Sequence, residues 1–369
     1  MTMILNEAEV KELLDMRDCI EAVEDAYREL AFDRAFNIPR GRMRYPSNLE
    51  GNDYFFNCIP GSVLKFNFAG IRIDSVTRVR SSEDLKRSHA GTPIDNKFCG
   101  LILLFSISTG ELAAILPDFT ISGVRVGATS AIALKYLARK DAKRMALFGS
   151  GKQARTHAEA ICRTLPIEEI RVFSPNREHR VAFAAEMTEK SDAEIIPVDH
   201  PRKAVEDADI IVGTSNSNRP VFEGEWLREG ATVVTITGGD RHANQARGFK
   251  RREIDETTVL RSNRIVVNSR EQVMIDEQPE LFDLIHEGNL KLDEIPELQE
   301  IVVGKAPGRT NDKEVFLFNN NTGTGIQFIA AGVKVYENAK KKGMGREIPT
   351  DWFMTDLSAW IAKGFSPSP

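Results

Sequence analysis

The stretch Met145-Ala146-Leu147-Phe148-Gly149-Ser150-Gly151-Lys152-Gln153-Ala154 decides the fold. Its four leading apolar residues predict a short strand, and residues 153–161 are compatible with a helix. In the turn between them, Gly149 allows a tight bend, Gly151 lets the backbone approach a pyrophosphate, and Ala154 permits close packing of helix on strand. The free N–H groups at the start of the helix favour phosphate binding. The stretch therefore predicts a dinucleotide-binding turn.

Two other interpretations of this turn are weaker. Gly151-Lys152 suggests a phosphate-binding loop of the ATPase kind, but Gln153 stands where that loop needs Ser or Thr, and the spacing differs. An ordinary βα turn is disfavoured by the further strands predicted around it. We therefore assign the following residues to a cofactor site: Gly149, Gly151, Lys152, Gln153 and Ala154.

Short apolar strands alternate with helices from Lys143 onward. Such alternation predicts an α/β fold with a doubly wound parallel sheet. The expected strands are Met145–Phe148, Glu169–Phe173, Glu194–Val198, Asp209–Gly213, Thr232–Thr237 and Arg264–Val267.

The N-terminal part does not show this alternation, and its pattern predicts an α+β region with antiparallel strand pairs. Apolar residues at helical spacing begin the chain, and strand-like runs come after them. A further helix is expected from about Val124 to Ala138. A strand from Glu314 and a helix at Ile326–Lys342 are expected to pack back on this region. The expected division is residues 1–124 with 314–369, and residues 125–313 for the dinucleotide-binding domain. The strand-like runs are Tyr54–Ile59, Leu64–Ile73, Leu101–Ser106 and Glu111–Leu116.

The end of the second parallel strand bears on the kind of cofactor. The sequence after Phe173 contains Asn176 and Arg177, without an acidic residue that would bind the ribose 2′-hydroxyl of NAD. A nearby arginine can accommodate a 2′-phosphate, so we expect NAD(P) with a preference for NADP(H). The alternative is that Arg177 is only the first exposed residue of the next helix. Thr214 and Ser215 close the fourth strand at the same edge and are further expected cofactor contacts.

Composition excludes several classes of function. The formal net charge is −5 with no long run of one sign, which disfavours nucleic acid and anionic membranes as partners. The four cysteines are scattered without a CxxC pair, so neither a metal site nor a disulfide framework is expected. The N-terminus lacks the features of a signal peptide, and no apolar run is long enough to span a bilayer. We expect a cytoplasmic enzyme.

The sequence resembles the ornithine cyclodeaminase/mu-crystallin family. The resemblance rests on Ser122-Gly123-Val124-Arg125-Val126-Gly127-Ala128-Thr129-Ser130-Ala131 and on the dinucleotide-binding turn, with support from Ile236-Thr237-Gly238-Gly239-Asp240 and Gly308-Arg309. It implies a substrate and dimerisation domain with an inserted Rossmann domain, assembled as a homodimer. It also implies hydride transfer between a nicotinamide and the carbon next to a carboxylate in a small amino or imino acid.

The resemblance also implies roles for individual residues. Arg125 matches the arginine that binds the substrate carboxylate, and Arg42 matches a second one, although Arg40 and Arg44 compete for that role. Asp240 matches the acidic residue that faces the substrate nitrogen. A planar guanidinium can bind a carboxylate through two hydrogen bonds, which a lysine cannot copy.

Three departures from the family pattern bear on the reaction. Arg72 stands where the family has a lysine, and arginine cannot act as a proton shuttle, so Arg72 is expected at the catalytic site as an anion binder. Asn57 replaces an acidic residue of the cyclodeaminases, and Phe328 replaces an Asp after Gln327. These departures favour a ketimine reductase or amino-acid dehydrogenase.

Two alternatives remain open from the sequence. One is an ammonia lyase of the cyclodeaminase type that recycles its NAD. The other is a protein that binds NADP(H) and a small ligand without turnover. Of two histidines near these motifs, His157 is expected to be structural, and His242 is a weaker acid–base candidate than Asp240.

Overall fold

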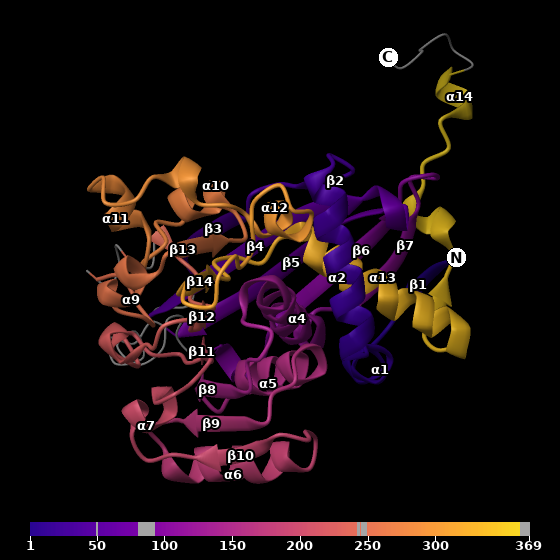
Figure 1. Ribbon diagram of the computed structural model, residues 1–369. Helices are drawn as coiled ribbons and strands as arrows, with labels where there is room; N and C mark the ends of the chain where they lie inside the picture. Colours follow the sequence, from indigo (N-terminus) through magenta and orange to yellow (C-terminus); the bar gives the residue numbers. More distant parts are fainter. Residues whose placement is uncertain (49–50, 80–92, 242–243, 245–248, 362–369) are drawn as a thin grey trace.

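The computed structural model describes residues 1–369 except 49–50, 80–92, 242–243, 245–248 and 362–369. It contains two sheets that lie side by side, each covered by helices (Figure 1). The first sheet has eight strands in the order β15-β1-β7-β6-β5-β4-β2, with β3 also paired to β4. The second has seven strands in the order β10-β9-β8-β11-β12-β14-β13.

The first sheet is antiparallel except where β1 pairs with β7, as the sequence predicts for this region. Its strands are β1 (Thr2–Ile4), β2 (Ala35–Asn37), β3 (Gly41–Pro46), β4 (Asn52–Val63), β5 (Phe68–Val79), β6 (Cys99–Ser106), β7 (Leu112–Pro117) and β15 (Arg346–Ile348). The strand expected at Leu64–Ile73 begins later. Leu64–Phe66 forms a 3₁₀ turn that ends at Asn67 in the left-handed conformation, and β5 starts at Phe68.

The second sheet is parallel throughout, which confirms the doubly wound prediction. Its strands are β8 (Arg144–Phe148), β9 (Glu169–Phe173), β10 (Glu194–Pro197), β11 (Ile210–Gly213), β12 (Thr232–Thr235), β13 (Arg264–Val267) and β14 (Phe316–Asn319). Every residue of β11, β12 and β14 is buried, because helices cover both faces of such a sheet.

The helices of the chain fall into two groups. Those packed with the first sheet or between the sheets are α1 (Glu7–Leu13), α2 (Met16–Ala31), α4 (Phe119–Leu137), α12 (Leu298–Val302) and α13 (Gly325–Lys342). Those of the parallel-sheet region are α5 (Lys152–Thr164), α6 (Arg177–Thr188), α7 (Pro201–Val205), α9 (Glu256–Arg261), α10 (Arg270–Ile275) and α11 (Phe282–His286), and α14 (Ser358–Ile361) follows near the C-terminus.

The expected domain boundaries need two corrections. The strand expected from Glu314 exists as β14, but it lies inside the parallel sheet between β12 and β13 and does not return to the first domain. The boundary at 124/125 falls within α4. The return to the first sheet is made by α13, which contacts β4, β5 and β6. The chain therefore crosses between the two regions through α4 and again between β14 and α13.

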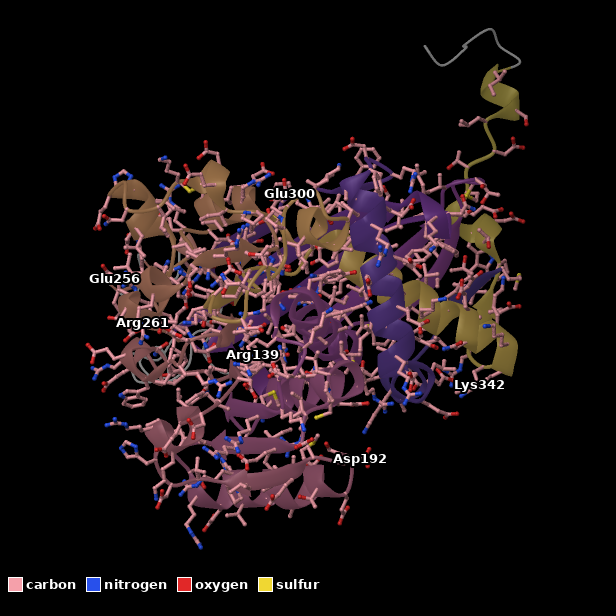
Figure 2. The ribbon with its side chains drawn as sticks, viewed as in Figure 1. Arg139, Asp192, Glu256, Arg261, Glu300 and Lys342 are labelled. Carbon is pink, nitrogen blue, oxygen red and sulfur yellow. The ribbon has the colours of Figure 1, made fainter. Side chains whose placement is uncertain are left out.

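Charged side chains of both signs are spread over the whole molecule (Figure 2). Several form ion pairs between neighbouring elements, such as Arg270 with Glu300 at 2.9 Å. No helix in the described part of the chain is long and apolar enough to cross a membrane. The same residues contain no cluster of His, Cys, Asp and Glu that could hold a metal ion, and all four cysteines are free thiols.

Candidate active site

A cavity of about 1180 Å³ lies between the two sheets. One wall is the carboxyl edge of the parallel sheet, after β8, β9, β11 and β12, where ligands bind in doubly wound folds. The other wall is the face of β3, β4 and β5. The cavity therefore joins the dinucleotide-binding turn to the region that carries the expected substrate residues.

The turn after β8 has the geometry that a pyrophosphate needs. Gly149 has φ of +113°, and a Cβ atom there would lie 2.8 Å from the carbonyl oxygen of Thr214. Gly151 precedes the first turn of α5 without a side-chain cap, and a Cβ atom there would meet nothing within 4 Å. Ala154 is fully buried, as close helix packing requires. The residues present thus fit a dinucleotide, with open space and free N–H groups where its phosphates would lie.

Lys152 lines the cavity, but its ammonium group turns toward the start of α4. It donates a hydrogen bond to the carbonyl oxygen of Phe119 and lies 3.4 Å from the centre of the Phe119 ring. Burial lowers the pKa of Lys152 to about 8, against the opposing effect of nearby Asp118. The side chain of Gln153 also lines the cavity, and its buried Oε1 atom has no hydrogen-bond partner.

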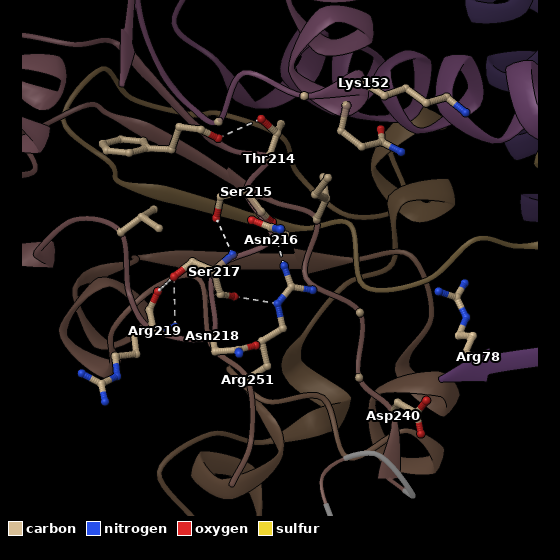
Figure 3. Close-up of a pocket in the computed structure, with 18 of the residues that line it drawn as sticks. Arg78, Lys152, Thr214, Ser215, Asn216, Ser217, Asn218, Arg219, Asp240 and Arg251 are labelled. Atoms are coloured by element: carbon tan, nitrogen blue, oxygen red, sulfur yellow. Dashed lines mark hydrogen bonds between the residues drawn. The ribbon is translucent and has the colours of Figure 1, made fainter. Parts of the chain in front are cut away.

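The loop after β11 forms the far side of the cavity (Figure 3). The hydroxyl of Thr214 donates to the carbonyl of Phe148 at 2.8 Å, which ties this loop to the dinucleotide-binding turn. Arg251 donates to the carbonyls of Ser215 and Ser217, each at 2.7 Å. Glu253 accepts from the backbone N–H of Ser215 at 2.6 Å. The sequence predicted Thr214 and Ser215 here but missed Arg251 and Glu253, which lie far along the chain without a recognisable motif.

The tip of β9 differs from the expectation in detail. Ser174, Pro175 and His179 line the cavity, whereas Asn176 and Arg177 do not. The Asn176 side chain instead caps α6 and accepts a hydrogen bond from the backbone N–H of His179 at 3.1 Å. The structure therefore gives Arg177 no place on the cavity wall.

The substrate wall is built by cross-strand neighbours. Arg42 on β3 pairs with Asn57 on β4, which pairs with Asp74 on β5. Two residues further along β3, Arg44 pairs with Phe55 of β4, and the Arg44 guanidinium lies 4.7 Å from the centre of the Phe55 ring. Alternate residues of a strand point to the same face, so the three arginines predicted here share one wall of the cavity.

Arg72 is held by two carboxylates at the inner end of this wall. It donates to Oδ2 of Asp118 at 2.6 Å and also pairs with Asp74. Asp118 is fully buried, and burial raises the pKa of its carboxyl while Arg72 lowers it. Asn57 donates to Asp74 at 2.7 Å, so it extends the same network. Arg72 lines the cavity as a fixed cation, which is compatible with an anion-binding role.

Arg125 is buried behind the cavity wall and is not among the residues that line it. It donates to Oε1 of Gln327 at 2.8 Å, and its guanidinium lies 4.6 Å from the centre of the Phe328 ring. Phe328 also lies 5.5 Å from the Arg72 guanidinium, so the ring that replaces the family Asp packs against both cations. Burial lowers the pKa of Arg125 to about 10, and Arg72 adds to this effect.

The three arginines of the β3 region have different partners. Arg44 pairs with Asp53 at 3.0 Å, and Arg42 pairs with Asp276, at the end of α10. Arg40 makes no salt bridge with any residue that the structure describes, and its side-chain Nε has no hydrogen-bond partner. Burial lowers the pKa of Arg40 to about 9, with further contributions from Arg42 and Arg125. Of these three arginines, Arg40 is therefore the one without a salt bridge to a described residue, although the nearby Asp276 carboxylate acts to raise its pKa.

Asp240 follows Gly238-Gly239 and lines the cavity next to the end of β12. In the close-up it lies on the same side of the view as Arg78 of β5, away from the Thr214–Arg219 loop (Figure 3). The sequence prediction that Asp240 reaches the site is consistent with this place. His242, the weaker acid–base candidate, falls outside the described residues.

A buried hydrogen-bond chain lies behind the site. From Gln327 it passes to the hydroxyl of Tyr27 at 2.7 Å and on to Asn268 at 2.9 Å. It continues through Asn320 and Ser130 to His157, whose Nδ1 lies 2.7 Å from the carbonyl of Gln153. Burial lowers the pKa of His157 to about 4, which favours the neutral imidazole and is consistent with a structural role. The chain links Arg125 to the dinucleotide-binding helix.

The family model of the ornithine cyclodeaminase/mu-crystallin family matches residues 1–343. The chain belongs to this family. Among curated relatives, Delta(1)-pyrroline-2-carboxylate reductase of Bacillus cereus is 30% identical over 94% of this chain and 99% of its own length. The resemblance seen in the sequence is thus confirmed, and with it an NAD(P)-dependent oxidoreductase of the imine reductase and dehydrogenase type.

Solved structures agree with this assignment. Delta(1)-pyrroline-2-carboxylate reductase of Thermococcus litoralis, in complex with NADH and L-proline, is 30% identical, covers 94% of this chain and 100% of its own, and has a TM-score of 0.80. The iminosuccinate reductase of Paracoccus denitrificans, in complex with NAD⁺, has a TM-score of 0.78 at 24% identity and covers 94% of this chain and 99% of its own, which supports the fold alone.

Proposed function

We propose that this enzyme reduces a small cyclic 2-imino acid, such as Delta(1)-pyrroline-2-carboxylate, to the corresponding amino acid. The observation that carries the proposal is the pair of guanidinium groups of Arg40 and Arg125, each of which has a buried Nε atom without a hydrogen-bond partner and makes no salt bridge with the described residues. Arg125 and Arg72 both lower the pKa of Arg40, and Arg72 also lowers the pKa of Arg125, in each case after the larger effect of burial. A substrate carboxylate bound by Arg40 in the cavity, with the charge of Arg125 behind the wall, would relieve this repulsion, which favours Arg40 over Arg42 as the second carboxylate ligand.

The remaining roles follow from where the residues lie. A bound reduced nicotinamide dinucleotide would supply the hydride, held by Gly149, Gly151 and the start of α5. Asp240 would face the substrate nitrogen, stabilise the iminium and then exchange a proton with the amine. Arg72 stays charged between Asp74 and Asp118, so it orients the carboxylate and moves no proton. This assignment disfavours ornithine cyclisation, for which protons must be taken up near the substrate amine.

We propose NADP(H) as the preferred cofactor and a homodimer as the assembly. The cofactor proposal is supported by the described tip of β9, where Ser174, Pro175 and His179 line the cavity and no carboxylate would repel a 2′-phosphate. Arg177 would have to turn from the start of α6 to reach that phosphate. The dimer proposal is supported by the family.

The substrate proposal is tested by comparing two imines with the purified enzyme. NAD(P)H oxidation should be rapid with Delta(1)-pyrroline-2-carboxylate and at least about 100-fold less efficient with 1-pyrroline, which lacks the carboxylate. Equal kcat/KM for the two imines would refute the proposed carboxylate site. No oxidation of NADH or NADPH with any 2-imino acid would refute the reductase proposal itself.

A further inference from the structure

Glu253 is a fully buried carboxylate that does not itself line the cavity, but it holds both loops that bring Ser215 and Asp240 there. Its Oε1 atom accepts hydrogen bonds from the backbone N–H of Ser215 at 2.6 Å and from the Ser215 hydroxyl at 2.7 Å. Its Oε2 atom accepts from the hydroxyls of Thr235 and Thr237, each at 3.2 Å. One oxygen therefore holds the loop after β11, and the other holds the end of β12 and the loop after it.

The end of β11 leaves room for this carboxylate. Gly213 is the last residue of β11, and it pairs in register with Thr235 of the neighbouring β12. A Cβ atom on Gly213 would lie 2.7 Å from Cδ and 2.8 Å from Oε2 of Glu253. The absence of a side chain at this position thus allows the carboxylate to lie against the ends of two adjacent strands.

A second hydrogen-bond path leads from Glu253 to the loop of Asp240. The backbone N–H of Glu253 donates to Oε1 of Glu280 at 3.2 Å, and Nε2 of Gln278 donates to Oε2 of Glu280 at 2.8 Å. Oε1 of Gln278 accepts from the backbone N–H of Gly239, the residue before Asp240, at 2.9 Å. The Gly239 peptide is therefore connected to the segment of Glu253 through buried side chains.

The segment of Glu253 is also anchored to the loop after β11. Arg251 donates to the carbonyls of Ser215 and Ser217 in this loop (Figure 3). The backbone N–H of Val221 donates to the carbonyl oxygen of Glu253 at 3.0 Å. Removing the carboxylate would leave the N–H of Ser215 without its acceptor, and an unsatisfied polar group in such a place favours movement of the loop.

We propose that Glu253 is a positioning residue, which sets the spacing between the loop of Ser215 and the loop of Asp240. This inference rests on the proposed function, in which the dinucleotide lies along the carboxyl edge of the parallel sheet and Asp240 faces the substrate nitrogen. The spacing then aligns the hydride donor with the residue that acts on the substrate, and hydride transfer depends on such alignment.

The first test needs neither cofactor nor substrate, and it compares two variants that separate length from charge. Glu253→Asp keeps the charge but is one methylene shorter, so it cannot reach both loops together. Glu253→Gln keeps the length, because its amide oxygen can accept from Ser215 while its NH₂ group donates to the threonine hydroxyls.

Hydrogen–deuterium exchange of residues 214–218 and 236–241 is measured in the free enzyme for wild type and both variants. We expect exchange about tenfold faster in both loops of Glu253→Asp, and a smaller increase in Glu253→Gln. Wild-type exchange in both loops of Glu253→Asp would overturn the proposal.

The second test separates positioning from general stability. In Glu253→Asp, kcat per folded enzyme should fall by about 100-fold, because a small displacement of a catalytic group has effects of this size, while KM for the imino acid changes little. Glu253→Gln should keep most of kcat.

Asp255→Ala is the matched control in the same segment. The Asp255 carboxylate caps α9 through the backbone N–H of Thr258 and accepts from the N–H of Gly224. This variant should lower the melting temperature and leave kcat unchanged. An unchanged kcat in Glu253→Asp, or equal losses of kcat in Glu253→Asp and Asp255→Ala, would overturn the proposal. A wild-type enzyme that reduces no 2-imino acid would refute the proposed function, whereas the exchange measurement would still decide the link between Glu253 and the two loops.

Discussion

The dinucleotide-binding turn and the substrate wall are built in opposite ways. The turn is contiguous: Gly149 to Ala154 form one loop and the start of one helix, and their geometry follows from local backbone requirements. The substrate wall combines β3, β4 and β5 with partners more than 200 residues away, such as Asp276 for Arg42 and Gln327 for Arg125. A contiguous site can be deduced from its sequence, whereas a site assembled across strands depends on pairings that the sequence does not contain.

The largest effect is expected at Asp240, where the two regions meet. Asp240→Asn keeps the shape of the side chain but removes its charge and its capacity to accept a proton. We expect kcat to fall by about 10²- to 10⁴-fold, with dinucleotide affinity unchanged. Steady-state kinetics and a fluorescence titration with NADPH would measure both quantities. An Asp240→Asn variant with wild-type kcat would show that the carboxylate does not take part in the chemistry.

Removing a carboxylate-binding arginine should weaken substrate binding and leave dinucleotide binding unchanged. Arg125→Ala and Arg40→Ala should each raise KM for the imino acid by about 100-fold, since the buried carboxylate loses a charged partner. Arg44→Ala is the matched control, because Arg44 is neutralised by Asp53 on the same wall. Arg44→Ala should change KM little. Equal effects of all three substitutions would indicate a general electrostatic field and no specific carboxylate site.

These two regions also explain how far the sequence could predict the molecule. The parallel strands and the dinucleotide-binding turn were predicted because each has a local pattern. The position of β14 was not predicted, because nothing in its four residues, three of them apolar, indicates that it lies between β12 and β13. Likewise, the family resemblance matches Arg42 to the second carboxylate ligand, but Arg40 and Arg44 compete with it in the sequence. Only Asp276 and Asp53, which lie on other elements, distinguish them.

The glycines of the turn allow a paired prediction within the contiguous site. Gly151→Ala should fold normally, because its Cβ enters open space, but should weaken dinucleotide binding by about tenfold or more, because that space is needed for the pyrophosphate. Gly149→Ala should instead lower the free energy of unfolding by about 1–3 kcal/mol, because its φ is positive and Thr214 is in contact. Thermal melts and dinucleotide titrations would separate the two. The reverse pattern would contradict the geometry described for the turn.

The smallest effect is expected at Arg177. If Arg177 turns toward the 2′-phosphate, Arg177→Ala should weaken NADPH binding by about fivefold or less, as for other exposed ion pairs, and leave NADH binding unchanged. Glu178→Ala, next in α6, is the control. Tighter binding of NADH than NADPH by the wild-type enzyme would refute the proposed cofactor preference, and the rest of the site would stand.

The central claim is that the site reduces an imine with net consumption of dinucleotide and does not recycle it. One measurement tests this directly: the dinucleotide oxidised, the amino acid formed and the ammonia released are quantified in one reaction, first with Delta(1)-pyrroline-2-carboxylate and then with L-ornithine. We expect one NAD(P)H oxidised for each proline formed from the imine, and no ammonia or proline from ornithine. Sustained release of ammonia from ornithine with only a catalytic amount of dinucleotide would contradict the account.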